Sequence, residues 1–334
     1  MEPLDAKNLP SIAGYRLIEE IGHGQAATVY KALRLNGHSE VVALKLLRPG
    51  NEGQRRRFER EVEVQKSLDC PGVVRCLDSG RANGALYYAM EFVEGVALDA
   101  FLASATTLDE KLLVFERLCD ALAQAHARGV AHRDLKPANV LVDAQGQPHI
   151  LDFGICALQA DDWSTWLRSQ QTQPGDIIGT IKYMSPEQAW GGLLGPIDHR
   201  TDIWSLGVIL FEMATGGRYP YKLDGLPGKS ITESLLHRIR HERSETPRIV
   251  FPQYAVQLKT LIDACLAHEP DRRLSSAAAL ADDIQRVRTG QRIGTARRSR
   301  IHSLERLAIG LVVNQPHALR VSGLAAVLTF LTVL

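Results

Sequence analysis

Two short polar motifs in the middle of this 334-residue chain limit its possible folds more than any other feature. The first is HRDLKPAN at positions 132–139, and the second is LDFG at positions 151–154. Asp134 is a candidate proton acceptor, and Lys136 places a positive charge two residues later. Asn139 and Asp152 offer hard oxygen ligands, the type that Mg²⁺ prefers. The two motifs therefore predict one active site that combines a metal ion with a proton acceptor.

This set of residues resembles the catalytic loop and metal-binding motif of Hanks-type (eukaryotic-like) serine/threonine protein kinases of bacteria. The resemblance implies an α+β, bilobal protein kinase fold. Its N-terminal lobe would hold a small antiparallel β-sheet and one helix, and its larger C-terminal lobe would be mostly α-helical. It also implies ATP and Mg²⁺ as cofactors, with Mn²⁺ as a possible substitute, and transfer of the γ-phosphate to Ser or Thr hydroxyls of proteins. Asp134 and Lys136 would then be catalytic, and Asn139 and Asp152 would bind the metal.

Composition adds a few exclusions. The apolar share of 45% and the charged share of 23% are ordinary for a globular protein. A net charge of +1 gives no overall nucleic-acid footprint, so we expect no nucleic-acid partner. The 5 cysteines form no CxxC pair and suggest reduced cytosolic thiols. The first residues show no secretory signal, so we expect a cytoplasmic kinase domain.

The motifs also suggest how the chain is divided. Residues 1–14 are expected to form a polar leader, and residues 15–288 the kinase domain. Within that domain, 15–94 would be the N-terminal lobe and 95–288 the C-terminal lobe. Residues 289–334 would form a basic, then apolar, tail.

From Tyr15 the chain predicts two strands joined by a glycine-containing turn, GHGQAATV at 22–29. Glycines let a backbone approach phosphates closely. The turn resembles the kinase glycine-rich loop, with Ala27 in place of the third glycine, although an ordinary hairpin turn remains an alternative. The resemblance implies that ATP is covered by this loop, at Ile21, Gly22, His23, Gly24, Gln25, Ala26, Ala27, Thr28 and Val29.

Lys45 lies in the apolar stretch Val42-Ala43-Leu44-Lys45, where an unpaired ammonium would be costly. By resemblance it bridges the α- and β-phosphates of ATP and a helix glutamate. The amphipathic segment 54–68 offers Glu59, Glu61 and Glu63. Similarity to related bacterial kinases selects Glu61, and the other two could equally be charges on a solvated face.

The segment EFVEG at 91–95 resembles the hinge between kinase lobes. Backbone groups of Glu91 and Val93 would bond adenine, and Met90 would be the gatekeeper residue or a plain core residue. A mostly apolar pocket is typical of ligand sites. Its expected apolar walls are Val29, Ala43 and Leu141. Before the hinge, Asn83-Gly84 predicts a tight hairpin turn between two strands.

In the second half of the chain, apolar residues recur at helical spacing over 109–128, and Gly129 follows as a C-cap. This pattern predicts a long buried helix beneath the catalytic loop. The resemblance implies structural or regulatory roles for six further residues. His132 would be a scaffold and Arg133 would bind an activation-loop phosphate. Thr180 would bond Asp134 and Lys136, Asp202 would hold the catalytic-loop backbone, and Glu187 would pair with Arg273.

The segment from Asp152 to Glu187 resembles a kinase activation segment. Autophosphorylation there, by a possible homodimer, has four candidate sites: Ser164, Thr165, Ser169 and Thr172.

The tail is rich in arginine over 286–306 and apolar over 321–334. The apolar end is shorter than the about 20 residues that span a bilayer. Three interpretations stay open: a membrane helix cut short, a peripheral anchor on the inner membrane, or a helix packed on the kinase or a partner. Two rival functions also remain, a scaffolding pseudokinase and a small-molecule phosphotransferase.

Overall fold

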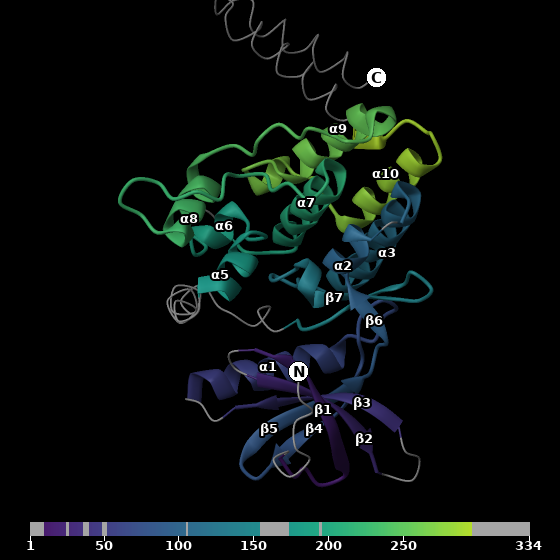
Figure 1. The fold of residues 1–334 in the computed structure, drawn as a ribbon, viewed down its shortest axis with the longest axis vertical. Helices are drawn as coiled ribbons and strands as arrows, with labels where there is room; N and C mark the ends of the chain where they lie inside the picture. The colour runs from purple at the N-terminus through teal and green to yellow at the C-terminus, as the bar shows by residue number, and fades with distance from the viewer. Residues whose placement is uncertain are drawn as a thin grey trace, which may run out of the picture.

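The computed structural model describes residues 10–24, 27–35, 40–48, 52–104, 106–153, 174–193 and 196–295. These residues form two lobes, a β-sheet with one helix and a larger helical lobe, joined near β6 (Gly95–Ala97) (Figure 1). The predicted arrangement of a small β-sheet lobe and a larger helical lobe is therefore confirmed.

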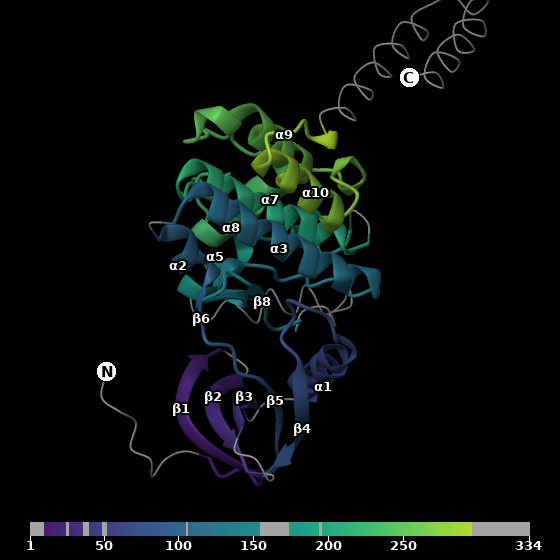
Figure 2. The same ribbon diagram turned by 90° about the vertical axis from the view of Figure 1, so that its right-hand side faces the viewer.

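The N-terminal lobe is a five-stranded antiparallel sheet in the order β1-β2-β3-β5-β4. Its strands are β1 (Tyr15–His23), β2 (Ala27–Arg34), β3 (Glu40–Leu47), β4 (Cys76–Ala82) and β5 (Ala85–Glu91). The helix α1 (Glu52–Ser67) packs beside β4 and β5 (Figure 2). Asn83 and Gly84 both adopt left-handed backbone angles, φ 51° and 81°, as the predicted tight turn requires.

The C-terminal lobe is built on helices that share one large hydrophobic core. They are α2 (Leu98–Ala103), α3 (Leu108–Ala127), α5 (Pro174–Ile181), α6 (Pro186–Ala189), α7 (Arg200–Thr215), α8 (Ile231–His241), α9 (Ala255–Cys265) and α10 (Ala277–Arg288). Helix α7 is buried along nearly its whole length, because most of its residues from Ile203 to Ala214 are apolar. It packs against α9 and α3.

Helix α3 confirms the helix predicted over 109–128. It begins after Thr107, whose hydroxyl and the Glu110 carboxylate form a reciprocal capping box. It ends before Gly129, whose φ of 77° is the left-handed angle common just past a helix. It packs against α10 and against the strand β8 (Pro148–Ile150).

A small sheet of β6, β7 (Val140–Asp143) and β8 lies between the lobes. The short 3₁₀ helix η2 (Pro137–Asn139) leads directly into β7. Further 3₁₀ turns are η5 (Pro252–Tyr254) and η6 (Pro270–Arg272). The two motifs at 132–139 and 151–154 thus flank the small sheet, which brings them to the junction of the lobes.

The packed structure extends past both expected ends of the kinase domain. Ile12 is buried and forms a β-bridge with Tyr15, so the end of the expected leader packs on the sheet. Beyond Arg288, the buried Thr295 donates its backbone N–H to the carboxylate of Asp283 at 3.0 Å. That carboxylate is itself buried, and Thr295 supplies donors that it needs.

Several predictions concern residues outside the described ranges. They are Gln25, Ala26, the candidate phosphosites Ser164, Thr165, Ser169 and Thr172, and the tail from 296 to 334. Within the described ranges, no helix has the length and apolar character needed to cross a membrane.

Candidate active site

The backbone of the catalytic loop is fixed by one buried carboxylate from α7. Asp202 accepts hydrogen bonds of 2.7 Å from the backbone N–H groups of His132 and Arg133, and another of 2.7 Å from His126 Nε2. Arg133 has a left-handed φ of 64°, which is strained for a side chain of this kind. Burial raises the pKa of Asp202, but the bonds from His126 and the backbone outweigh it and hold the pKa below its ordinary value. The ionised carboxylate thus supports a backbone shape that the loop alone would resist.

Asp134 is held by its own loop. Lys136 Nζ lies 2.9 Å from Asp134 Oδ2 and 2.9 Å from Thr180 Oγ1 on α5. Asn139 Nδ2 donates to the Asp134 carbonyl at 2.8 Å and to Asp134 Oδ2 at 3.2 Å. No hydrogen bond among the described residues uses Asp134 Oδ1 or Asn139 Oδ1, and none joins Thr180 directly to Asp134. One carboxylate oxygen and one amide oxygen are therefore left for other partners.

The second motif lies directly against the first. The Leu151 N–H donates to the Asn139 carbonyl at 2.8 Å, and the Leu151 carbonyl lies 2.9 Å from His132 Nε2. The His132 ring also packs 4.7 Å from the ring of the buried Phe153. His132 is therefore a contact between the motifs, as a scaffold residue would be. The segment that would carry a phosphate for Arg133 lies mostly outside the described residues.

Lys45 contacts two carboxylates at the junction of the lobes. Its Nζ lies 2.6 Å from Glu61 Oε1 on α1 and 2.8 Å from Asp152 Oδ1. Burial lowers the pKa of Lys45, but Asp152 and Glu61 outweigh it and raise the pKa above its ordinary value. Burial alone would raise the pKa of Asp152, but Lys45 outweighs it and holds the pKa below its ordinary value, so the carboxylate stays ionised.

Glu61 is the only one of the three candidate glutamates that the structure brings to Lys45. Glu59 instead pairs with Arg81 at 2.9 Å, and Glu63 is exposed on the outer face of α1. The helical spacing decides this, because Glu61 shares the inward face of α1 with the buried Phe58 and Val62.

The glycine-containing turn is shorter than expected, because β1 continues to His23 and β2 begins at Ala27. Arg48, just after β3, reaches back to it. Its guanidinium donates to the Gly24 carbonyl at 2.6 Å and to Thr28 Oγ1 at 3.2 Å, and it contacts His23. Arg48 thereby ties the turn to the strand that carries Lys45.

The expected adenine walls come from both lobes. Ala43 and Met90 are buried in one cluster, and Val29 and Val93 pack against it. Leu141 is half-buried in β7, where it pairs with Ala97 and His149. Ile21, at the end of β1, is 44% exposed.

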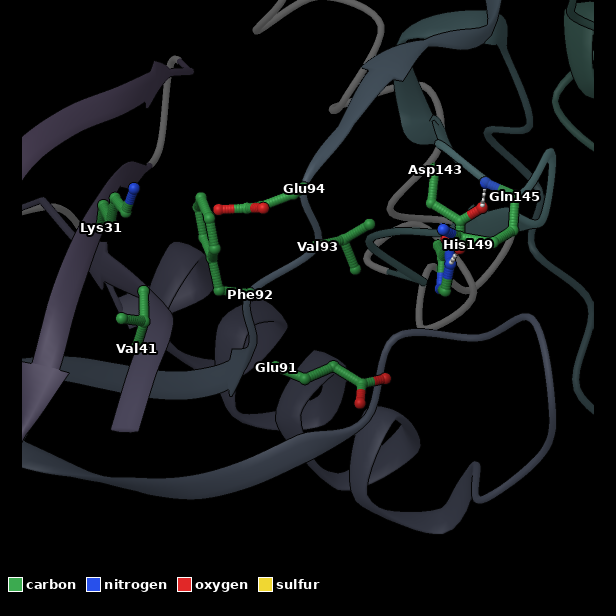
Figure 3. A pocket seen from close by; sticks show the side chains of 9 residues that line it. All are labelled: Lys31, Val41, Glu91, Phe92, Val93, Glu94, Asp143, Gln145 and His149. Atoms are coloured by element: carbon green, nitrogen blue, oxygen red, sulfur yellow. Dashed lines mark hydrogen bonds and ion pairs between the residues drawn. The ribbon is translucent and has the colours of Figure 1, made fainter. Parts of the chain in front are cut away.

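A cavity of about 510 Å³ opens beside the hinge. Figure 3 shows side chains from both lobes around it: Lys31, Val41, Glu91, Phe92, Val93, Glu94, Asp143, Gln145 and His149. No hydrogen bond among the described residues uses the backbone N–H or carbonyl of Val93. The hinge backbone at Val93 thus has free polar groups next to an open cavity.

Below the catalytic loop, Glu187 and Arg273 form a buried ion pair. Both nitrogens of the guanidinium fork lie 2.7 Å from the two Glu187 oxygens, and Thr201 Oγ1 adds a bond of 2.9 Å. Next to Glu187, Gln188 Nε2 donates to the Arg133 carbonyl at 2.7 Å. Helix α6 thus connects the ion pair to the catalytic loop.

Three residues at the site were missed by sequence reasoning: Tyr88, Arg48 and His126. The Tyr88 hydroxyl lies 3.0 Å from Glu61 Oε1 and 2.9 Å from Asp152 Oδ1. One signal could have found Tyr88, since strand alternation places it on the same face as Leu86 and Met90, and a buried phenol usually needs a partner. For Arg48 and His126 the sequence carries no comparable signal.

Comparison with known proteins gives consistent matches. The family model described as protein kinase domain matches residues 15–284. The serine/threonine-protein kinase PrkC of Bacillus subtilis is 33% identical over 290 residues, covering 85% of this chain and 42% of PrkC. Serine/threonine-protein kinase pkn3 of Myxococcus xanthus is 35% identical over 285 residues, covering 82% of this chain and 50% of pkn3.

A solved structure of the Mycobacterium tuberculosis PknI kinase domain superposes with a TM-score of 0.59 and 26% identity. The superposition covers 83% of this chain and 98% of the PknI chain. The chain spans half or less of the length of the curated relatives it matches. With the family model covering most of the sequence and the site built as described, the chain belongs to the protein kinase family, where its relatives are bacterial serine/threonine kinases.

Proposed function

We propose that this chain is an ATP-dependent serine/threonine protein kinase that transfers the γ-phosphate of ATP to Ser or Thr hydroxyls of proteins. One observation carries the proposal. The Lys45–Glu61–Asp152 cluster and the Asp134–Lys136 pair meet at the junction of the lobes, linked through the Leu151 N–H bond to Asn139. The names of the relatives, serine/threonine-protein kinases, support the same activity.

The donor set fits Mg²⁺. Asn139 uses its amide nitrogen on Asp134, which leaves its hard carbonyl oxygen, and Asp152 adds a carboxylate. The described residues contain no group of three or more His, Cys, Asp or Glu side chains suited to a metal. Mg²⁺ usually takes one or two protein ligands and completes its shell with water and substrate phosphates, and Asn139 and Asp152 offer two such ligands. When bound, Mg²⁺ or Mn²⁺ would neutralise phosphate charge.

Nucleotide binding would use the N-terminal lobe and the hinge. Lys45, anchored by Glu61, would bind the α- and β-phosphates, and the turn from Gly22 to Val29 would cover them. Adenine would lie among apolar walls and bond to the hinge backbone at Glu91 and Val93. Those walls would be Val29, Ala43, Met90 and Leu141.

Phosphate transfer would use the catalytic loop. Asp134 Oδ2 is occupied by Lys136 and Asn139, so Oδ1 is the oxygen available to accept the proton of a substrate hydroxyl. The hydroxyl oxygen would form a bond to the γ-phosphorus as the bond to ADP breaks. Lys136, held by Thr180, would stabilise negative charge on the moving phosphoryl group. Positioning and charge stabilisation would do most of the work.

The test is transfer of labelled γ-phosphate with Mg²⁺, to the chain itself and to a generic basic protein. We expect incorporation on Ser or Thr that disappears in Asp134→Asn and in Asp152→Asn. A wild-type chain that binds ADP yet transfers no phosphate would contradict the proposal and indicate a scaffolding pseudokinase.

Two finer features are part of this proposal. One is autophosphorylation between two copies, at Ser164, Thr165, Ser169 or Thr172, which phosphosite mapping of the active chain tests. The other is attachment of the cytoplasmic kinase domain to the inner membrane through the tail. Detergent-free fractionation of the chain with and without residues 307–334 tests it. Attachment requires that the chain with these residues reaches the membrane fraction and that the chain without them does not.

A further inference from the structure

We propose that Tyr88 is a positioning residue for the metal site, whose hydroxyl orients Asp152 for a divalent cation. This inference rests on the proposed kinase function. It assigns a role to a side chain outside both polar motifs.

Tyr88 is built into the site from the opposite strand. It lies on β5 directly across from Lys45 on β3, and its side chain is fully buried. Its hydroxyl lies 3.0 Å from Glu61 Oε1 and 2.9 Å from Asp152 Oδ1. Lys45 Nζ contacts the same two oxygens at 2.6 and 2.8 Å. Two donors and two acceptors therefore alternate around a closed ring of four polar atoms.

The ring is unbalanced in charge. Two carboxylates meet one ammonium, and Tyr88 adds a donor without adding a positive charge. A phenol has a single hydrogen, so its hydroxyl serves one of the two carboxylates at a time. Because Lys45 holds Glu61 at the short distance of 2.6 Å, the Tyr88 hydrogen can be donated to Asp152 Oδ1 and hold that oxygen when a cation takes up the charge of the carboxylate.

The ring of hydrogen bonds also fixes the orientation of the Asp152 carboxylate. Both donors hold the same oxygen, Oδ1, and no hydrogen bond among the described residues uses Oδ2. Asp152 has a left-handed φ of 46°, a conformation that side-chain contacts must support. Removing one of two donors would let the carboxylate rotate. Loss of a partner that orients a metal ligand typically weakens metal affinity by about 10–100-fold.

The experiment measures ADP binding by isothermal titration calorimetry, with Mg²⁺ and with a chelator, for wild type, Tyr88→Phe and Tyr87→Phe. Tyr87 is the matched control, because it is the next residue on β5 and packs on the other side, against Tyr15. We expect the gain in ADP affinity from Mg²⁺ to fall by about tenfold in Tyr88→Phe. Metal-free ADP binding should stay within about twofold of wild type, and Tyr87→Phe should match wild type.

An unchanged or larger Mg²⁺ gain in Tyr88→Phe would overturn the inference. So would an equal loss of ADP binding with and without metal, because that would indicate a general packing defect. 4-Aminophenylalanine at position 88 restores a donor on a ring of the same size and should restore the gain. If Tyr88→Phe does not fold, Tyr88→Met gives the same comparison. Failure of wild type to bind ADP at all would reject the proposed function as well, which separates the two failures.

Discussion

Two ionic clusters, one between the lobes and one in the C-terminal lobe, differ in their charge balance. Glu187 and Arg273 pair one carboxylate with one guanidinium through two bonds of 2.7 Å, and both side chains are almost completely buried. At the junction of the lobes, Lys45 faces two carboxylates at 2.6 and 2.8 Å, and Asp152 keeps about a third of its side chain exposed. We call Glu187 and Arg273 the closed pair, because their charges balance. We call Lys45, Glu61 and Asp152 the open cluster, because one negative charge is left over.

This difference shows that the burial of charged groups is not enough to distinguish a structural site from a functional one. A closed pair has no surplus charge to attract a ligand. Removing one partner leaves the charge of the other buried and uncompensated. An open cluster with surplus negative charge favours a cation. Substitutions in the two clusters and around them can test this contrast.

The largest effect is expected on the chemistry of the open site. Replacing Asp134→Asn removes the proposed proton acceptor and should reduce phosphate transfer by about 10²–10⁴-fold. The fold should persist, because Asn retains a side-chain oxygen to accept from Lys136. Single-turnover transfer and a urea unfolding curve on the same protein check both parts. Near-normal transfer would show that another group accepts the proton.

The closed pair should show the reverse pattern, a loss of stability. Arg273→Met leaves the Glu187 carboxylate buried without its partner, and we expect about 3–5 kcal/mol less stability in urea unfolding. The double replacement Glu187→Met with Arg273→Met should recover most of the loss. The control Arg272→Met alters an exposed neighbour with a weak ion pair at 3.7 Å, and should cost less than about 1 kcal/mol. Equal losses at positions 272 and 273 would contradict a special role for the buried pair.

Acid should weaken the closed pair. Burial raises the pKa of Glu187, but Arg273 outweighs it and holds the pKa below its ordinary value. A lowered folded-state pKa gives stability that is present above the ordinary value and is lost as the pH falls through the folded value. The stability advantage of wild type over Glu187→Gln, from urea unfolding at several pH values, should therefore shrink as the pH falls.

Glu212 provides the opposite sign in the same lobe. Burial raises its pKa, and the Tyr183 and Lys182 partners only partly offset this. Its contribution should therefore weaken as the pH rises, so wild type should gain on Glu212→Gln as the pH falls. Equal pH slopes for the two variants would show that the local partners do not set these titrations.

The smallest effect is expected at the partly exposed Arg48, which contacts the glycine-containing turn through Gly24 and Thr28. Arg48→Met should weaken ATP binding by about two- to fivefold, because the turn must then be ordered on binding. The exposed Arg56→Met on α1 is the control and should leave ATP affinity unchanged. Calorimetric titration with a non-hydrolysable ATP analogue measures both, and a larger loss at Arg56 would exclude this role for Arg48.

Contacts between residues that are close in the chain are the ones that follow most directly from the sequence. Asp134, Lys136 and Asn139 lie within a few residues of one another, and Pro137 starts a 3₁₀ turn, so the chain itself brings them together. The Asn83-Gly84 turn and the helix after Thr107 were predictable for the same reason, since their signals are short-range.

The contacts between distant segments were harder to predict. Choosing Glu61 over Glu59 and Glu63 needed resemblance to relatives. The three glutamates are two residues apart, and the sequence alone does not say which face of α1 turns toward Lys45. Tyr88 was missed because its partners lie on α1 and beyond β8, and its meeting with Lys45 depends on the pairing of β3 with β5. Strand alternation predicts a face, but it does not predict what packs on that face.

By itself, the sequence determined the family and the fold class, and it predicted which groups would react. These follow from motifs whose residues are close in the chain, where backbone geometry limits how they can lie. Only the tertiary structure decided that Lys45 meets both Glu61 and Asp152, and that Tyr88 completes their ring. Such contacts join four separate elements, and the energy that selects them comes from burying those elements together.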